Sequence, residues 1–110
     1  MSITISDDVV HVLVNCSVDS DIYEEVASIA AEQLELFKKQ HGYLGGAVMK
    51  SKESNTIVTY LQWRCKEDHD ACLQSSDWHS DENAKTFAQW MQAGKVKIKP
   101  EVYDLIATLE

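Results

Sequence analysis

A hydroxyl and an indole stand four residues apart at Thr59 and Trp63, and an imidazole follows at His69. Side chains alternate between the faces of a strand, so Thr59 and Trp63 share one face if this stretch is extended. Both groups donate hydrogen bonds, and aligned donors in a dry pocket stabilise a negative charge that develops on a bound oxygen. His69, with an ordinary pKa of roughly 6.5, can take or return a proton. We therefore regard Trp63, His69 and Thr59 as candidate catalytic residues.

Three further side chains are candidates for substrate binding: Asn15, Trp78 and Phe87. Asn15 can orient a second oxygen, and the two aromatic rings can clamp a flat molecule. Structural alternatives stay open for several candidates. Indoles such as Trp63 and Trp78 bury large areas whatever the function. His69 lies in a charged run, which is typical of a solvated helix face, and Asn15 can serve only the backbone of its own strand.

Metal, phosphate and thiol chemistry find little support in the sequence. Potential metal ligands gather in one stretch, at His69, Asp70, His79, Asp81 and Glu82. Their spacing matches neither HxxxH nor HExxH, so we expect no metal site. The pair Gly45-Gly46 is not followed by the Lys-Ser/Thr of a phosphate-binding loop. Cys72 has no recognisable histidine partner, and nearby acidic residues raise rather than lower a thiol pKa.

The elements that position these residues alternate along the chain. Runs rich in β-branched residues predict strands over residues 9–18, 44–50, 56–65 and about 96–109. Apolar residues at helical spacing predict helices over about 21–40, 67–74 and 84–94. Asp21 and Glu24 match a capping box at the start of the first helix, and Pro100 confines the last strand to a sheet edge or bulge. This order predicts one α+β domain over residues 1–110, a ferredoxin-like split βαβ fold with an antiparallel sheet.

The strands carry apolar side chains on both faces, which bears on partners. Helices that pack on one side of a single sheet leave its other face bare. We expect five apolar residues on that face: Val10, Val12, Val14, Val58 and Tyr60. An exposed apolar sheet face of this size usually marks an interface. The sequence therefore predicts a homodimer whose two sheets face each other.

Composition excludes several classes of function. The chain has 110 residues, with 18 acidic and 10 basic side chains and a formal net charge of -8. Such a charge repels nucleic acids and anionic membrane surfaces, so we expect neither as a partner. Three cysteines without CxxC spacing indicate free thiols rather than a disulfide framework. The acidic N-terminal segment lacks the pattern of a secretory signal, and no apolar run is long enough for a membrane helix, so we expect a cytoplasmic protein.

One stretch, HGYLGGAVMKSKESNTIVTYLQW from His41 to Trp63, resembles the antibiotic biosynthesis monooxygenase family. Members tend to have a Pro-Gly-Phe/Tyr turn after the first helix, then a hairpin whose second strand ends in an aromatic-x-x-Trp element. Here these become His41-Gly42-Tyr43 and Tyr60-Leu61-Gln62-Trp63. The resemblance implies a dimeric α/β barrel, with a pocket in each subunit between the helices and one sheet face.

The closest functional branch of that family oxygenates polycyclic phenols to quinones with molecular oxygen and no cofactor. It uses an asparagine four residues before the strand tryptophan, the tryptophan itself, and a tyrosine early in the next helix. This chain keeps Trp63, has Thr59 in place of the asparagine and places His69 near the tyrosine position. The resemblance thus implies a monooxygenase acting on a small aromatic, phenol-like compound. Trp63 and Thr59 would hold a phenolate oxygen, and His69 would move the proton.

Two other functions stay open on the same scaffold. Heme-degrading members of the family use a first-strand asparagine, a helix tryptophan and a histidine that ligates iron. Asn15 fits the first position, but the other two fall near Cys72 and Asn83, and His79 lies about one helical turn too early. Heme is therefore the alternative cofactor. A non-catalytic ligand-binding dimer is the other alternative, because a fold does not establish chemistry.

Overall fold

The structure is a computed structural model that describes residues 9–107 and 109. The strands are β1 (Val10–Val18), β2 (Tyr43–Lys50), β3 (Thr56–Trp63) and β4 (Val96–Tyr103). The helices are the 3-10 turn η1 (Ser20–Ile22), α1 (Tyr23–Lys38), α2 (Lys66–Leu73), α3 (Ser76–Ser80) and α4 (Glu82–Gln92). None of the helices in the described part of the chain is long and apolar enough to cross a membrane. The N-terminal segment that lacks a secretory pattern falls outside the described residues.

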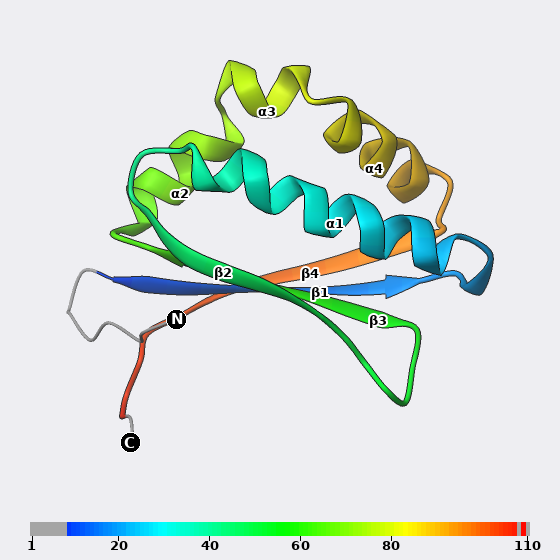
Figure 1. Ribbon diagram of the computed structural model, residues 1–110, viewed down its shortest axis with the longest axis horizontal. Coiled ribbons are helices and arrows are strands. Elements are labelled where there is room, and N and C mark those ends of the chain that lie inside the picture. The colour runs from blue at the N-terminus through cyan, green and yellow to red at the C-terminus, as the bar shows by residue number, and fades with distance from the viewer. Residues whose placement is uncertain (1–8, 108, 110) are drawn as a thin grey trace.

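The four strands form one antiparallel sheet in the order β2-β3-β1-β4, and the helices cover one of its faces (Figure 1). The predicted α+β, ferredoxin-like fold is confirmed. Pro100 lies in β4, which is an edge strand, as its missing N–H requires. The sheet register sets Val14 opposite Thr59 and Val12 opposite Leu61, so these side chains point the same way.

That register corrects one expectation about the bare face of the sheet. Val10, Val12 and Val14 point toward the helices, where Val12 is fully buried, and not away from them. Val58 and Tyr60 do lie on the opposite face, as expected, because Val58 pairs with Asn15 of β1. Both faces of β1 carry apolar residues. The alternation of side chains along the strand therefore assigns each residue to one of two faces, but it does not show which face packs against the helices.

Helix α1 lies across the sheet and buries one stripe of side chains, Val26, Ala30, Gln33 and Phe37. Their spacing of four, three and four residues keeps them on one face of the helix. The helix begins at Tyr23, and no side chain caps its N-terminus, so the predicted capping box is wrong. Asp21 lies instead in the preceding 3-10 turn, where its carboxylate accepts a hydrogen bond from Lys95 Nζ at 3.0 Å.

Two further boundaries differ from the sequence prediction. The serine-rich segment between the predicted second and third helices starts a helix of its own, α3, because the Ser75 hydroxyl accepts a hydrogen bond from the Trp78 N–H at 3.2 Å. The last strand ends at Tyr103 rather than near residue 109. Tyr103 pairs with His11, which lies near the start of β1, so β4 has almost no further residues of β1 with which to pair.

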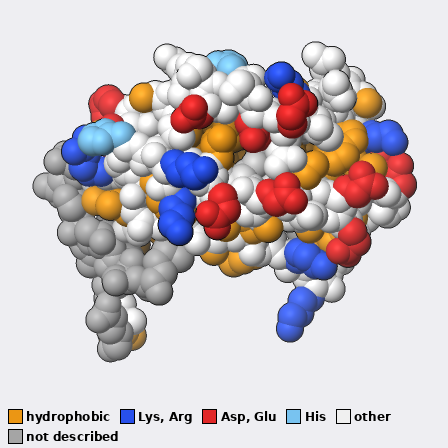
Figure 2. All heavy atoms as spheres, turned by 45° about the horizontal axis from the view of Figure 1, so that its top comes forward, with side chains coloured by type: hydrophobic (Ala, Val, Ile, Leu, Met, Phe, Trp, Pro, Cys, Tyr) orange, Lys and Arg blue, Asp and Glu red, His pale blue; other side chains and the backbone are white. Residues whose placement is uncertain are grey.

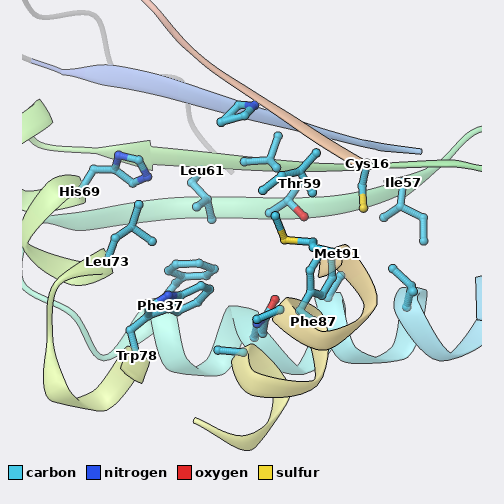
Figure 3. Close-up of a pocket in the computed structure, with 18 residues that line it drawn as sticks. Cys16, Phe37, Ile57, Thr59, Leu61, His69, Leu73, Trp78, Phe87 and Met91 are labelled. Carbon is cyan, nitrogen blue, oxygen red and sulfur yellow. The ribbon is translucent and has the colours of Figure 1, made fainter. Parts of the chain in front are cut away.

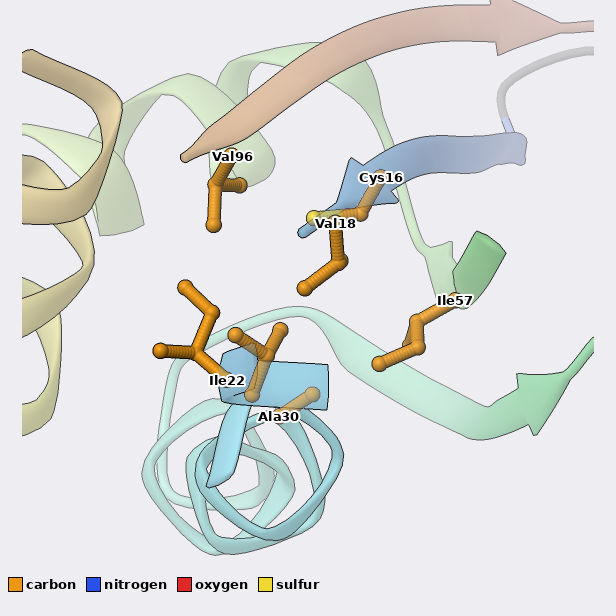
Figure 4. Close-up of a cluster of buried hydrophobic side chains, with 7 residues drawn as sticks. Cys16, Val18, Ile22, Ala30, Ile57 and Val96 are labelled. Atoms are coloured by element: carbon orange, nitrogen blue, oxygen red, sulfur yellow. The ribbon is translucent and has the colours of Figure 1, made fainter. Parts of the chain in front are cut away.

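The hydrophobic core divides into two clusters between α1 and the sheet. One cluster, drawn in Figure 4, contains Cys16, Val18, Ile22, Val26, Ala30, Ile57 and Val96. The other contains Val10, Val12, Phe37, Leu61, Trp63 and Cys72. Because Ile57 and Leu61 are four residues apart on β3, the clusters are offset along the sheet by roughly 13 Å. The middle of α1 and the middle of β3 lie between them.

Candidate active site

A cavity of about 370 Å³ lies between the helices and the helix-facing side of the sheet (Figure 3). This volume is near the lower end of the range for small-molecule sites, roughly 300–1,000 Å³. The wall includes members of both core clusters and is mainly aliphatic and aromatic. Its apolar residues are Val14, Cys16, Val26, Ala30, Phe37, Ile57, Leu61, Leu73, Trp78, Ala84, Phe87, Ala88, Met91, Ile98 and Pro100. Three amide, hydroxyl or imidazole side chains complete it: Gln33, Thr59 and His69. No Lys, Arg, Asp or Glu is among these described lining residues.

Four of the six candidate residues line this one cavity. Thr59 points into it from β3, His69 from α2, Trp78 from α3 and Phe87 from α4. Figure 3 shows His69 and Thr59 on either side of Leu61, with Phe37 and Trp78 on the opposing wall. The Phe37 and Trp78 rings stack with centroids 5.4 Å apart, which gives that wall a broad aromatic surface.

Trp63 is separated from the cavity. Its side chain is 0% exposed and is surrounded by the rings of Phe37, Tyr43 and His69, with centroids 5.6–6.2 Å from its own. The indole Nε1 is buried and has no hydrogen-bond partner in the described part of the structure. In this arrangement the indole cannot donate to a ligand, because the His69 and Phe37 rings lie between it and the cavity. The prediction that Trp63 and Thr59 hold one oxygen together does not match this geometry.

Asn15 lies on the other side of the sheet. It is exposed, and it pairs with Val58 and Lys99, both of which belong to the strand positions facing away from the helices. The expectation that Asn15 joins Thr59 at one site is therefore wrong. The cause is the register of β1: Val14, one residue earlier, is the position opposite Thr59.

His69 is the titratable group best placed for proton transfer. The residue is 9% exposed, and its ring contacts Trp63 at a centroid distance of 5.6 Å. Burial lowers the pKa of His69 below 6.5, and this effect exceeds the opposing attraction of the Asp70 carboxylate. Asp70 lies 3.7 Å from His69 Nδ1 but is held by Lys66 Nζ at 2.8 Å. The imidazole is therefore neutral at pH 7 and able to accept a proton.

Gln33 is a cavity residue that the sequence analysis missed. It is 9% exposed on the apolar stripe of α1, between Ala30 and Phe37, and its amide makes no hydrogen bond with the described residues. Its spacing from Val26, Ala30 and Phe37 was visible in the sequence. A polar side chain at a core position of an otherwise apolar helix stripe is the signal that would have found it.

The remaining chemical groups have other surroundings. Within the described residues, no group of three or more His, Cys, Asp or Glu side chains is arranged to hold a metal ion. Asp81 caps α4 by accepting from the Ala84 N–H at 2.9 Å, and His79 is exposed. Burial raises the pKa of both Cys16 and Cys72 to about 11, so neither thiol is an activated nucleophile.

The cavity fits a heme poorly. His69 is the one imidazole in its wall, and the described lining holds no cationic side chain for the two propionates. The position expected to carry an iron ligand, Asn83, donates a hydrogen bond from Nδ2 to Glu32 at 2.8 Å on the surface. The reaction proposed below therefore does not involve a heme.

Comparisons with known proteins rest on structure. No family model and no curated protein sequence matches the chain. SnoaB, a cofactor-independent oxygenase from Streptomyces nogalater, superposes with a TM-score of 0.71 at 15% identity, covering 93% of this chain and 97% of that one. A candidate antibiotic biosynthesis monooxygenase from Nitrosomonas europaea gives 0.72 at 15% identity, covering 94% and 96%. A conserved protein from Bacteroides thetaiotaomicron, a possible oxidoreductase of unknown function, gives 0.72 at 14% identity, covering 91% and 100%.

These likenesses cover nearly the full length of each chain. They confirm that this protein has the fold of antibiotic biosynthesis monooxygenases, as its resemblance to that family implied. At such low identity they show the fold alone, so the chemistry has to be argued from the cavity itself.

Proposed function

We propose that the protein is a cofactor-independent monooxygenase that oxidises a small, uncharged, phenol-like aromatic compound with molecular oxygen. The observation that carries this proposal is a neutral, buried His69 in the wall of an apolar cavity. The named function of a structural neighbour, a cofactor-independent oxygenase, supports the same chemistry. The apolar wall and the stacked Phe37 and Trp78 rings favour a flat aromatic ligand.

The protein's part in this reaction is to create and hold an electron-rich anion. His69 takes the phenol proton, and the Thr59 hydroxyl donates to an oxygen of the ligand. The anion passes one electron to O2, and the two radicals combine to form a carbon–oxygen bond. The resulting peroxide takes back the proton held by His69. The C–H bond at the peroxide-bearing carbon then breaks, and its electron pair forms the second bond of the new carbonyl as the O–O bond breaks. The hydroxide that leaves takes up the released C–H proton, so one oxygen atom of O2 ends in the quinone and the other in water.

Trp63 acts in this scheme as a positioning residue rather than a catalytic one. Its ring packs against the His69 imidazole at a centroid distance of 5.6 Å and so restricts the orientation of the imidazole. A Trp63→Phe change therefore lowers the rate by misplacing His69, without removing a group that touches the ligand.

Oxygen uptake with a panel of hydroxylated anthrones and hydroquinones tests the proposal. We expect His69→Gln to lower the rate by roughly 10²- to 10⁴-fold, because it removes the proton acceptor and keeps a polar side chain of similar length. The matched control is His79→Gln, since His79 is exposed on α3 and does not line the cavity. Wild-type rates in the Trp63→Phe/His69→Ala double variant would refute these roles.

A ligand-binding protein without catalysis is the second candidate, favoured by the separation of Trp63 from the cavity. It predicts that the same phenols bind and shift the tryptophan fluorescence, while no oxygen is consumed by any member of the panel. A heme titration tests the remaining alternative, a heme-binding protein. A tight complex with a shifted Soret band would contradict the poor fit described above.

A further inference from the structure

Gln33 places a carboxamide where the surrounding core is apolar. It is nine-tenths buried and lines the cavity, yet its amide has no hydrogen-bond partner among the described residues. A carboxamide that faces an apolar wall gives up hydrogen bonds with bulk water and contributes less to the core than leucine would. Gln33 is part of the cavity wall, so its amide can direct its donors and acceptor into the cavity. Its unused hydrogen-bonding capacity therefore points to a ligand.

The position of Gln33 along the cavity follows from its neighbours on α1. Val26 and Ala30 belong to the core cluster that contains Ile57, whereas Phe37 belongs to the cluster that contains Leu61. Gln33 lies between these two groups on the same helix stripe, and Thr59 lies between Ile57 and Leu61 on β3. The amide and the Thr59 hydroxyl thus approach the middle of the cavity from opposite walls.

His69 stands apart from this pair. Its ring packs on Trp63 at the end of β3, and Figure 3 shows Leu61 between His69 and Thr59. The cavity therefore has two polar positions, one at the His69 end and one in the middle, separated by apolar surface. The Thr59 hydroxyl has no hydrogen-bond partner among the described residues either.

We infer that Gln33 is a specificity-determining residue, which together with Thr59 binds an uncharged oxygen substituent in the middle of an aromatic ligand. This inference rests on the proposed function of the cavity and deepens it, because it assigns the ligand a second oxygen besides the phenol at His69. An amide offers two donors and an acceptor, and a hydroxyl offers one donor and two lone pairs. Together they accommodate a ketone or a hydroxyl group. Without a nearby cation they disfavour a carboxylate.

When no ligand is bound, water can form hydrogen bonds with the Gln33 amide. A ligand that enters the cavity displaces this water. A ligand with an oxygen at this point replaces those hydrogen bonds, whereas its hydrocarbon counterpart leaves the amide unpaired. Discrimination then arises from the protein group that is left buried without a partner. The expected preference for the oxygenated ligand is roughly ten- to hundredfold in affinity.

A matched ligand pair tests this inference without any turnover. 9-Fluorenone and fluorene share one three-ring frame and differ by a central carbonyl, and neither contains a phenol to be oxidised. We expect the wild-type protein to bind fluorenone more tightly than fluorene. Titration calorimetry measures both affinities, and the tryptophan fluorescence, to which Trp78 in the cavity wall contributes, gives a second readout. In Gln33→Leu the preference should collapse or reverse, because fluorenone loses a partner and fluorene no longer leaves a buried amide unpaired.

Controls separate this effect from a change in stability. Gln33→Met keeps the length of the side chain and should behave like Gln33→Leu, and thermal unfolding verifies that both variants fold. Gln89→Leu makes the same chemical change on the exposed side of α4, outside the cavity wall, and should keep the wild-type preference. Thr59→Val should reduce the preference by a smaller factor.

The outcomes distinguish this inference from the proposed function. Equal affinities for the two ligands in the wild-type protein, or an unchanged preference in Gln33→Leu, would overturn the role of Gln33. The oxygen-uptake result with His69→Gln would stand independently of that. Failure of both ligands to bind would overturn the cavity as an aromatic site, and with it the inference.

Discussion

At the scale of single residues, three polar side chains face an otherwise apolar cavity, and His69 is the titratable one among them. Burial keeps the imidazole neutral, and its Nδ1 is enclosed without a hydrogen-bond partner in the described structure. Gln33 and Thr59 are uncharged, and their hydrogen bonds can orient a ligand in the cavity. In the proposed reaction, proton transfer and ligand recognition are assigned to different side chains, so each can be altered separately.

The lowered pKa of His69 has a consequence for stability against acid. Because the folded pKa lies below the unfolded value of about 6.5, the unfolded chain binds more protons in the window between them. Stability should therefore fall as the pH drops through and below 6.5. Urea unfolding at pH 7.5 and 5.5 measures this loss, which we expect to be smaller in His69→Gln than in the wild-type protein.

The exposed histidine His79 provides the control for that measurement. His79→Gln should keep the wild-type loss of stability between the two pH values, because this change leaves the buried His69 in place. An equal loss in both variants would mean that His69 is not the residue responsible.

At the scale of elements, two glycines with positive φ end the helices that frame the cavity. Gly42, with φ +84°, follows α1, and Gly94, with φ +76°, follows α4. A Cβ on Gly42 would collide with the side chain of Asp68, which pairs with Arg64 at 3.0 Å, whereas a Cβ on Gly94 would meet open space. We expect Gly94→Ala to cost about 1 kcal/mol and Gly42→Ala about 2–3 kcal/mol. Equal costs in chemical denaturation would contradict the steric difference.

The helices and strands were largely predictable, because apolar residues recur in the sequence with periods of 3.6 residues in the helices and two residues in the strands. What could not be predicted is which face of β1 meets the helices. Both faces are apolar, and the pairing of Val14 with Thr59, a contact between distant segments, decides the matter. The side of the sheet on which Asn15 lies follows from that same pairing.

The candidate site was predictable in part. Thr59, His69, Trp78 and Phe87 were chosen by chemical type, and folding brings them to one cavity. Residue type could not reveal that Trp63 is sealed by three neighbouring rings, because an indole suits a core and a binding site equally well. Gln33 was missed because a search for catalytic groups passes over an amide on a helix.

At the scale of the whole molecule, helices cover one face of the sheet and leave the other without helices. Acidic side chains are spread over the helical side, with hydrophobic side chains visible between them (Figure 2). The helix-free face of the sheet carries the apolar residues Val58, Met49 and Tyr103, of which the last two are 49% and 40% exposed. We propose that a second copy of the chain covers this face, as the sequence led us to expect.

A charge introduced on that face should separate the two copies. We expect the wild-type protein to sediment as a dimer at micromolar concentration and Val58→Asp to sediment as a monomer, because a buried, unpaired carboxylate is costly. Gln89→Asp, on the exposed side of α4, is the matched control and should stay dimeric. A wild-type monomer at micromolar concentration would refute the proposed dimer.

Cys16 gives the cavity a property that concerns the durability of the protein. Its thiol lines the wall near Thr59, where a quinone, an electrophile that alkylates thiolates, would be formed (Figure 3). With a pKa of about 11, roughly one Cys16 in ten thousand is ionised at pH 7. If the proposed reaction takes place, the same burial that makes this residue useless as a nucleophile would protect the protein from being inactivated by its own product.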